Sequence, residues 1–167
     1  MASIIRLTGP LDPREGWDAE RCSVARAFDV VHTRSALLIL REAFYGTTRF
    51  GDFARRVGIS EPVAAARLKE LVDAGLLAQE DYREPGQRAR RLYRLTRKGA
   101  ELLPVLVALM DWGDRWASDD GGPVALRHRD CGAAVHAELR CDHGHRVEAG
   151  DLDLALGRGA RRSRAAP

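Results

Sequence analysis

The sequence lacks the features of membrane, secreted and exported proteins. Its 167 residues contain three cysteines, which cannot form the complete disulfide framework of a small secreted protein. No stretch approaches the roughly 20 apolar residues of a membrane-spanning helix, and the first ten residues have neither the charged nor the apolar region of a signal peptide. We therefore expect a cytoplasmic protein that has no contact with a membrane.

Catalytic motifs are missing as well. No nucleophile, base and orienting acid occur in a recognisable order, no glycine-rich loop is suited to phosphates, and no paired carboxylates suggest hydrolysis. We expect no enzyme activity. The formal net charge of the whole chain is only +3, so any strongly charged surface must be local.

One part of the chain, residues 49–96, has such a local imbalance and begins with two short helical patterns. In residues 49–57 the apolar side chains recur at spacings of three and four, which predicts a helix with one buried face. A second helix is expected from about residue 61 to residue 74, with Ser60 as its N-cap, Pro62 in its first turn and Gly75 after its end. Two helices joined this tightly predict a helix-turn-helix, whose second helix enters a major groove of DNA.

A β-hairpin is predicted directly after the helix pair. Residues 76–79 lead into a strand, residues 84–87 supply turn chemistry, and residues 91–95 alternate between polar and apolar side chains. Between Arg83 and Lys98 there are seven basic residues and a single acidic one, Glu84. Arginines on an isolated hairpin are usually only solvated, but behind a helix-turn-helix they predict contact with DNA phosphates.

The remaining pattern predicts a mainly α fold with this hairpin as a small wing, that is, a winged helix-turn-helix. Further helices are expected at residues 23–31 and 34–45, and Thr96 would cap a long final helix that Pro104 either kinks or delays to a start near Leu103. The expected divisions are an irregular arm (1–21), the winged-helix domain (22–118), a small β-rich appendage (119–150) and a basic, disordered tail (151–167).

Several short segments resemble the HxlR-type branch of bacterial winged-helix transcriptional regulators, which is related in architecture to the MarR-type regulators. The resemblance runs from about Cys22 to Trp116 and rests on the order and spacing of Cys22 and residues 37–42, 49–50, 59–60, 67–71, 74–76, 93–96 and 111–113. The sequence departs from the family in two respects. Ser35 stands where a tryptophan is usual, and Ala65 with Ala66 stand where the recognition helix more often has polar residues, so DNA shape should carry much of the specificity.

The expected partners are double-stranded DNA and a second copy of the chain. We expect contacts to DNA from Arg49, Ser60, Pro62, Val63, Ala66, Arg67, Lys69, Arg88, Arg90 and Arg91, with Arg67 and Lys69 as the foremost groove contacts. The resemblance implies a dimer, and the final helix carries a matching apolar stripe. Its predicted dimer contacts are Leu102, Leu106, Leu109, Trp112 and Trp116.

Cysteine and histidine chemistry suggests two further sites. Cys22 opens the first helix, where the helix dipole favours thiolate, and in some members of the family a cysteine at this place senses oxidants or electrophiles; the alternative is a structural cysteine. In the appendage, zinc is possible at His128, Cys131, Cys141 and His143. The alternative there is a metal-free hairpin, since the second half-site has Gly144 where relatives have cysteine, and no other cofactor is expected.

Two other functions remain open on the sequence alone. A winged helix can bind a protein instead of DNA, and the alanine-rich recognition helix favours that reading, although the seven bases of the wing do not. A small-molecule effector site is also possible between the last helix and the core, lined by Trp112, Trp116 or Trp17.

Overall fold

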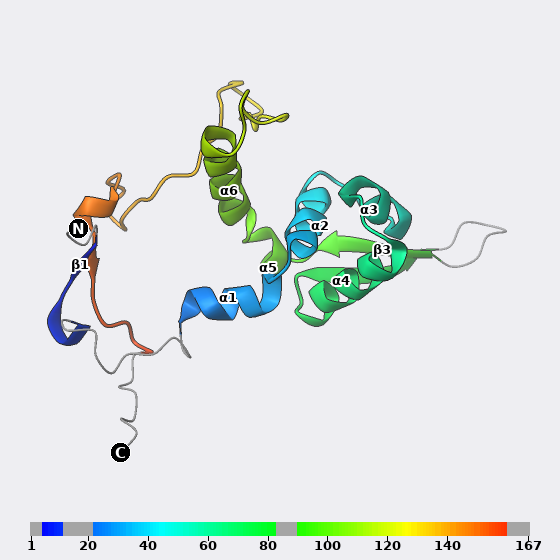
Figure 1. Cartoon of the computed structure of the whole chain (residues 1–167), viewed down its shortest axis with the longest axis horizontal. Helices are drawn as coiled ribbons and strands as arrows, with labels where there is room; N and C mark the ends of the chain where they lie inside the picture. The colour runs from blue at the N-terminus through cyan, green and yellow to red at the C-terminus, as the bar shows by residue number, and fades with distance from the viewer. Residues whose placement is uncertain (1–4, 12–21, 83–89, 160–167) are drawn as a thin grey trace, which may run out of the picture. The chain divides into compact units, whose positions relative to one another are not determined.

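A computed structural model describes residues 5–11, 22–82 and 90–159 of the chain (Figure 1). The chain divides into two units. The larger consists of residues 29–137, and the smaller combines residues 1–28 with residues 138–167. Helix α1 (Ser23–Val31) crosses the boundary between them. No helix in the described part of the chain is long and apolar enough to cross a membrane.

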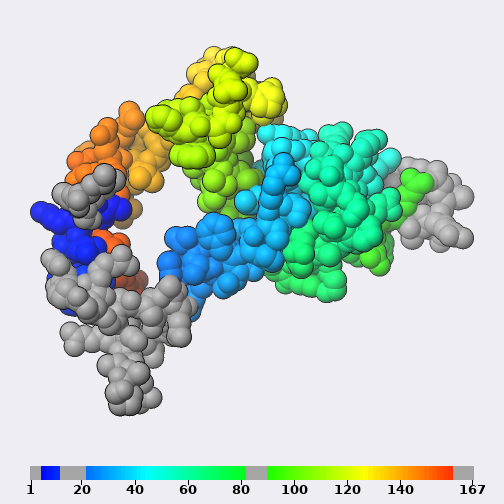
Figure 2. All heavy atoms as spheres, viewed as in Figure 1, coloured from blue at the N-terminus to red at the C-terminus, as the bar shows by residue number. Residues whose placement is uncertain are grey.

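Three helices form the body of the larger unit: α2 (Arg34–Phe44), α3 (Phe50–Val57) and α4 (Glu61–Asp73). Their apolar faces meet in one core, in which Ile39, Leu40, Phe53 and Leu68 are fully buried. In Figure 2 the cyan and green atoms of these helices form one continuous mass. The helix bounds agree with the sequence prediction to within one residue because capping residues and glycines mark them.

The turn between α3 and α4 has the geometry that a helix-turn-helix requires. Gly58 ends α3 with φ of +71°, a left-handed conformation that a side chain would disfavour. Ser60 is the N-cap of α4 by its extended backbone, although its hydroxyl makes no capping hydrogen bond among the described residues. The predicted helix-turn-helix is therefore present.

The wing consists of strands β2 (Leu77–Tyr82) and β3 (Arg90–Leu95), which pair antiparallel with Gln79 opposite Tyr93 and Asp81 opposite Arg91. Its returning strand is fixed to the start of α3. The Tyr93 N–H donates to the carbonyl of Thr48 at 2.8 Å, Arg49 forms a β-bridge with Leu92, and the ring of Tyr93 meets that of Phe53 edge-on at 6.2 Å. The predicted turn at residues 84–87 and Arg88 lie outside the described residues.

The final helix is divided into α5 (Arg97–Ala100) and α6 (Leu103–Trp116). Thr96 caps α5, because its hydroxyl accepts the Gly99 N–H at 3.0 Å, and Pro104 lies in the first turn of α6. Of the two outcomes expected for Pro104, the delayed start at Leu103 is the one observed. Gly99 is required at this junction, since a Cβ there would collide with the carbonyl oxygen of Leu76.

The two sides of α6 have different environments. Leu106 and Val107 are buried against the core, and Leu102 packs beside it, whereas Leu109, Trp112 and Trp116 are 50%, 62% and 70% exposed. The predicted dimer stripe is thus divided between the subunit's own core and an exposed apolar surface.

The segment after α6 has fewer strands than expected. Among the described residues of 119–150, β-structure is limited to isolated bridges, Arg127 with Ala134 and Arg140 with Arg146. The first bridge is held to α6 by Asp111, whose carboxylate accepts the Ala137 N–H at 2.7 Å and lies 3.3 Å from Nδ1 of His136. The segment therefore contains two tight turns, at residues 128–133 and 141–145, each flanked by an isolated bridge instead of a strand pair.

In the smaller unit, residues far apart in sequence form a short parallel pair. Strand β1 (Arg6–Leu7) pairs with β4 (Asp153–Leu154), and the guanidinium of Arg6 donates to both carboxylate oxygens of Asp153, at 2.6 and 2.7 Å. Short 3₁₀ turns, η1 (Gly9–Leu11) and η2 (Ala149–Asp151), lie beside these strands. The pair lies in the two segments for which the sequence predicted an irregular arm and a disordered tail. Strand formation at β4 is favoured because Leu152 and Leu154 alternate with acidic residues, as a strand requires.

Candidate nucleic-acid interface

The exposed residues in the first half of α4 are mostly small and apolar, and its exposed charged residues lie mainly in the second half. Pro62, Val63 and Ala66 are exposed, and Val63 retains 41% of its accessible surface. Opposite them Ala64, Leu68 and Leu71 are buried in the core. Because these side chains are buried, α4 is held in a fixed orientation on the core, with its other side exposed to solvent.

Arg67 is less free than the sequence suggested. Its side chain is only 23% exposed, and its Nη1 donates to Oε2 of Glu70 at 2.6 Å and lies 3.3 Å from Nε2 of His32. His32 comes from the turn between α1 and α2. The guanidinium therefore links α4 to the turn before α2, a geometry that favours positioning of the helix over contact with a base.

Lys69 is exposed but already paired. Its amine lies 2.5 Å from Oδ2 of Asp73 one turn later, and the lysine side chain is 75% exposed. Such exposed pairs contribute about 0.3–0.5 kcal/mol. The amine can therefore exchange its carboxylate for a phosphate at small cost.

The described part of the wing carries exposed cations. Arg90 and Arg91 at the start of β3 are exposed and have no ion-pair partner within the part of the chain that the structure describes. By contrast, Arg94 on the same strand is paired with Glu80 at 3.1 Å. Arg90 and Arg91 are thus the described wing cations best placed to bind an anion.

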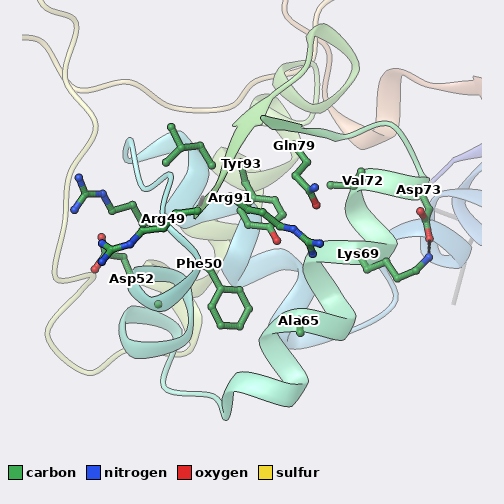
Figure 3. Close-up of a pocket in the computed structure, with 13 residues that line it drawn as sticks. Arg49, Phe50, Asp52, Ala65, Lys69, Val72, Asp73, Gln79, Arg91 and Tyr93 are labelled. Atoms are coloured by element: carbon green, nitrogen blue, oxygen red, sulfur yellow. Dashed lines mark hydrogen bonds and ion pairs between the residues drawn. The ribbon is translucent and has the colours of Figure 1, made fainter. Parts of the chain in front are cut away.

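Between these elements lies a concavity that we call the wing pocket. It has a volume of about 1070 Å³ and is formed by the start of α3, one side of α4 and the wing (Figure 3). Arg49, Lys69, Arg90 and Arg91, four of the predicted DNA contacts, line it. Figure 3 shows the side chain of Arg91 reaching across it towards α4, near Gln79, with the ring of Phe50 below.

The predicted redox and metal residues lie elsewhere. Cys22 is exposed, and the backbone N–H groups of Ala25 and Val24 hold the pKa of its thiol below the ordinary value. In the appendage, Nδ1 of His128 lies 3.3 Å from Sγ of Cys131, whereas Cys141 and His143 belong to the other unit. No cluster of three or more metal-binding side chains occurs among the described residues.

Comparison with known proteins identifies the architecture. The profile of the HxlR-like helix-turn-helix family matches residues 30–120, more than half of the chain. The chain belongs to this family. HxlR-like proteins are transcriptional regulators, which confirms the resemblance drawn from the sequence and the expectation that the chain is not an enzyme.

Individual proteins that are similar to this chain match different shares of it. The HTH-type transcriptional regulator Rv3095 of Mycobacterium tuberculosis is 43% identical over 122 residues, which are 72% of this chain and 76% of the relative. The crystal structure of PA1607 superposes with a TM-score of 0.72 at 35% identity, covering 83% of this chain and 96% of its own. The reduced form of the redox regulator HypR has a TM-score of 0.50 at 25% identity and covers 55% and 90%.

Sequence reasoning missed two features of this HxlR-like surface. The first is the contact between Arg67 and Glu70, which their spacing of three residues on a helix could have indicated. The second is the wing pocket, which combines Phe50, Gln79 and Tyr93 from three elements and left no signal in any single segment. The wing pocket is not the tryptophan-lined site that the sequence left open as an alternative. Trp112 and Trp116 are exposed on α6, and Trp17 lies outside the described residues.

Proposed function

We propose that this HxlR-family regulator binds double-stranded DNA sequence-specifically as a homodimer. Each subunit places α4 in a major groove and its wing on the neighbouring backbone or minor groove. The observation that carries the proposal is the exposed face of α4 beside two wing arginines, Arg90 and Arg91, that have no ion-pair partner among the described residues. An unpaired arginine can release counterions from DNA without first losing an internal ion pair.

The contacts divide into those that position the protein and those that read bases. Val63 and Ala66 are suited to thymine methyl groups, and Pro62 and Ser60 bring the start of α4 close to the groove floor. Phosphates are the expected partners of Arg49, Lys69, Arg88, Arg90 and Arg91, one of which can enter a narrow minor groove. Because residues 62–66 of α4 carry no polar side chain, DNA shape and deformability supply much of the specificity.

Arg67 has a supporting role in this proposal. Its ion pair with Glu70 and its contact with His32 hold α4 against the turn before α2. The base contact that the sequence assigned to Arg67 passes to the smaller exposed side chains of α4, Val63 and Ala66.

The dimer is proposed to form through the exposed side of α6. Leu109, Trp112 and Trp116 follow one another at spacings of three and four residues, so they lie on one helical face and leave a large apolar surface in contact with water. A two-fold arrangement of α6 helices would present two copies of α4 to half-sites about one helical turn of DNA apart.

A thiol signal is the second part of the proposal. Cys22 is exposed, and its lowered pKa favours the thiolate that reacts with oxidants and electrophiles. HypR, one of the similar structures, is described as a redox regulator. Oxidation or alkylation of Cys22 would then change the affinity for DNA.

Fluorescence anisotropy on the DNA upstream of the protein's own gene tests the proposal. The expected result is salt-sensitive binding at two protomers per site, much tighter than binding to a scrambled duplex of equal length. Equal, weak binding to both duplexes would contradict it. That outcome would favour the alternative, a winged-helix module that binds a protein.

A further inference from the structure

The wing pocket has a chemical character that a DNA backbone alone does not explain. Its cationic lining, Arg49, Lys69, Arg90 and Arg91, outnumbers its two acidic residues, Asp52 and Asp73. Both carboxylates are already engaged, Asp52 with Arg55 at 2.7 Å and Asp73 with Lys69. The pocket therefore has a net positive lining that would attract an anion.

The same pocket also has an apolar part. Phe50, Val72, Leu92 and Tyr93 contribute to its walls, together with the methyl group of Ala65. A phosphodiester presents no apolar body to such side chains. Small-molecule sites, in contrast, combine apolar walls with a few polar groups and have volumes of about 300–1,000 Å³, close to the 1070 Å³ found here.

The walls of the pocket are held in place by contacts within the chain. The Tyr93 N–H bond to Thr48 and the bridge between Arg49 and Leu92 fix β3 to the start of α3. Buried Leu68 and Leu71 fix α4 from the other side. A preformed site loses little conformational freedom when a ligand binds, which favours affinity.

From these observations we propose that the wing pocket binds a small organic anion with a flat apolar body, such as an aromatic carboxylate. The carboxylate pairs with Arg91, which reaches into the pocket with no ion-pair partner among the described residues, and the ring packs between Phe50 and Val72. The ligand occupies the space between α4 and the wing. Its carboxylate pairs with Arg91, which is then not available to a DNA phosphate. It therefore competes with DNA, a consequence that rests on the proposed function.

The test uses 2-naphthoate as the probe and the full-length protein without DNA. Binding of 2-naphthoate and of uncharged 2-naphthamide is measured by the anisotropy of naphthalene fluorescence, and the affinity for inorganic phosphate is measured by its competition with 2-naphthoate. We expect 2-naphthoate to bind about tenfold or more tightly than either, because one charge-assisted pair and one apolar contact are each worth about that factor. Equal affinity for the acid and the amide, or for the acid and phosphate, would overturn the proposal.

Two pairs of variants locate the site. Arg91→Gln should weaken 2-naphthoate binding about tenfold, whereas Arg94→Gln on the same strand, outside the pocket lining and paired with Glu80, should leave it unchanged. Ala65→Phe should place a ring in the part of the pocket where the naphthalene is expected and block its binding. Its control, Ala78→Phe, places the same ring on the strand face opposite Gln79. Binding that persists in Ala65→Phe would overturn the proposal by placing the probe elsewhere, for example on α6.

Competition with DNA is measured separately, so the two proposals can fail independently. Increasing 2-naphthoate should raise the apparent Kd of the wild-type protein for its upstream duplex and should not do so in Ala65→Phe at matched salt. Duplex binding without any probe binding would overturn this inference and leave the proposed function intact. Probe binding without displacement of the duplex would overturn the competitive mechanism.

Discussion

Arg67 donates a hydrogen bond to Glu70 one turn later on α4, with 2.6 Å between Nη1 and Oε2. The same nitrogen lies 3.3 Å from Nε2 of His32, so an arginine on the recognition helix is directed along the protein surface instead of outward. This geometry changes what its removal should do to DNA binding.

Arg67→Ala should weaken binding to specific and scrambled duplexes by similar factors. The substitution removes the contact with His32, which links α4 to the turn before α2, and the half-buried ion pair with Glu70. It should lower the free energy of unfolding by about 0.5–1 kcal/mol. Paired anisotropy titrations and denaturant unfolding check this. A selective loss on the specific duplex would return Arg67 to the role of a base reader, at a cost of about 1–3 kcal/mol.

Arg90→Ala should reduce the salt dependence of DNA binding. Removal of one phosphate contact lowers the slope of log K against log salt concentration by about 0.9. Arg94→Ala, the matched change on the same strand, should lower the slope less, since Arg94 is held by Glu80. Anisotropy titrations at four or more salt concentrations give both slopes, and equal slopes for the two variants would contradict the assignment.

Trp116→Ala and Leu106→Ala should separate association from folding on one helix. Trp116 is 70% exposed, so its removal should shift sedimentation equilibrium towards monomer with little effect on monomer unfolding. Leu106 is buried, and its truncation should cost about 2–5 kcal/mol of stability through the cavity that it leaves. Unchanged self-association in Trp116→Ala would argue against α6 as the dimer helix.

Cys22 should react with a thiol reagent at lower pH than a free cysteine does. The N–H groups of Ala25 and Val24 lower the pKa of the thiol below the ordinary value for cysteine, which is about 8.5. The thiolate of Cys22 is therefore populated at lower pH than that of a free cysteine. The alkylation rate against pH in a protein with Cys131→Ser and Cys141→Ser measures it. If diamide releases Cys22→Ser from DNA as readily as wild type, the proposed thiol switch is wrong.

Asp111→Asn should loosen the turn segment that follows α6. The Ala137 N–H is the main cause that lowers the pKa of Asp111, so ionised Asp111 stabilises the folded state above the unfolded-state pKa of about 3.9. This stabilisation is lost as the pH falls through the lowered value. Hydrogen exchange at the Ala137 amide should be faster in the variant at neutral pH and unchanged in Asp119→Asn.

Local signals predicted the winged helix well. Gly58, Pro104 and Thr96 each have a fixed backbone preference, so the ends of α3, α5 and α6 could be read from the sequence. Apolar spacing placed Phe53 and Leu68 in the core correctly. These features depend on residues close together in the chain.

Features that depend on distant residues were not predictable in the same way. Leu106 and Trp116 share one apolar spacing, and only the packing of α6 on α2 decides that the first is buried and the second exposed. Arg67 had an outward position on a helical wheel, but its long side chain turns to His32, which is 35 residues away. The wing pocket likewise exists only once α3, α4 and β3 have packed together.

The parallel pair between β1 and β4 joins residues 147 positions apart in the chain. Closing a loop of that length costs more chain entropy than any local contact, and two short strands return little of it. We therefore expect this pair to form late in folding and to open well before the winged helix unfolds. In amide exchange, Thr8 and Leu154 should then behave as a fast, separate kinetic unit, while the amides of α2 and α4 exchange only through global unfolding.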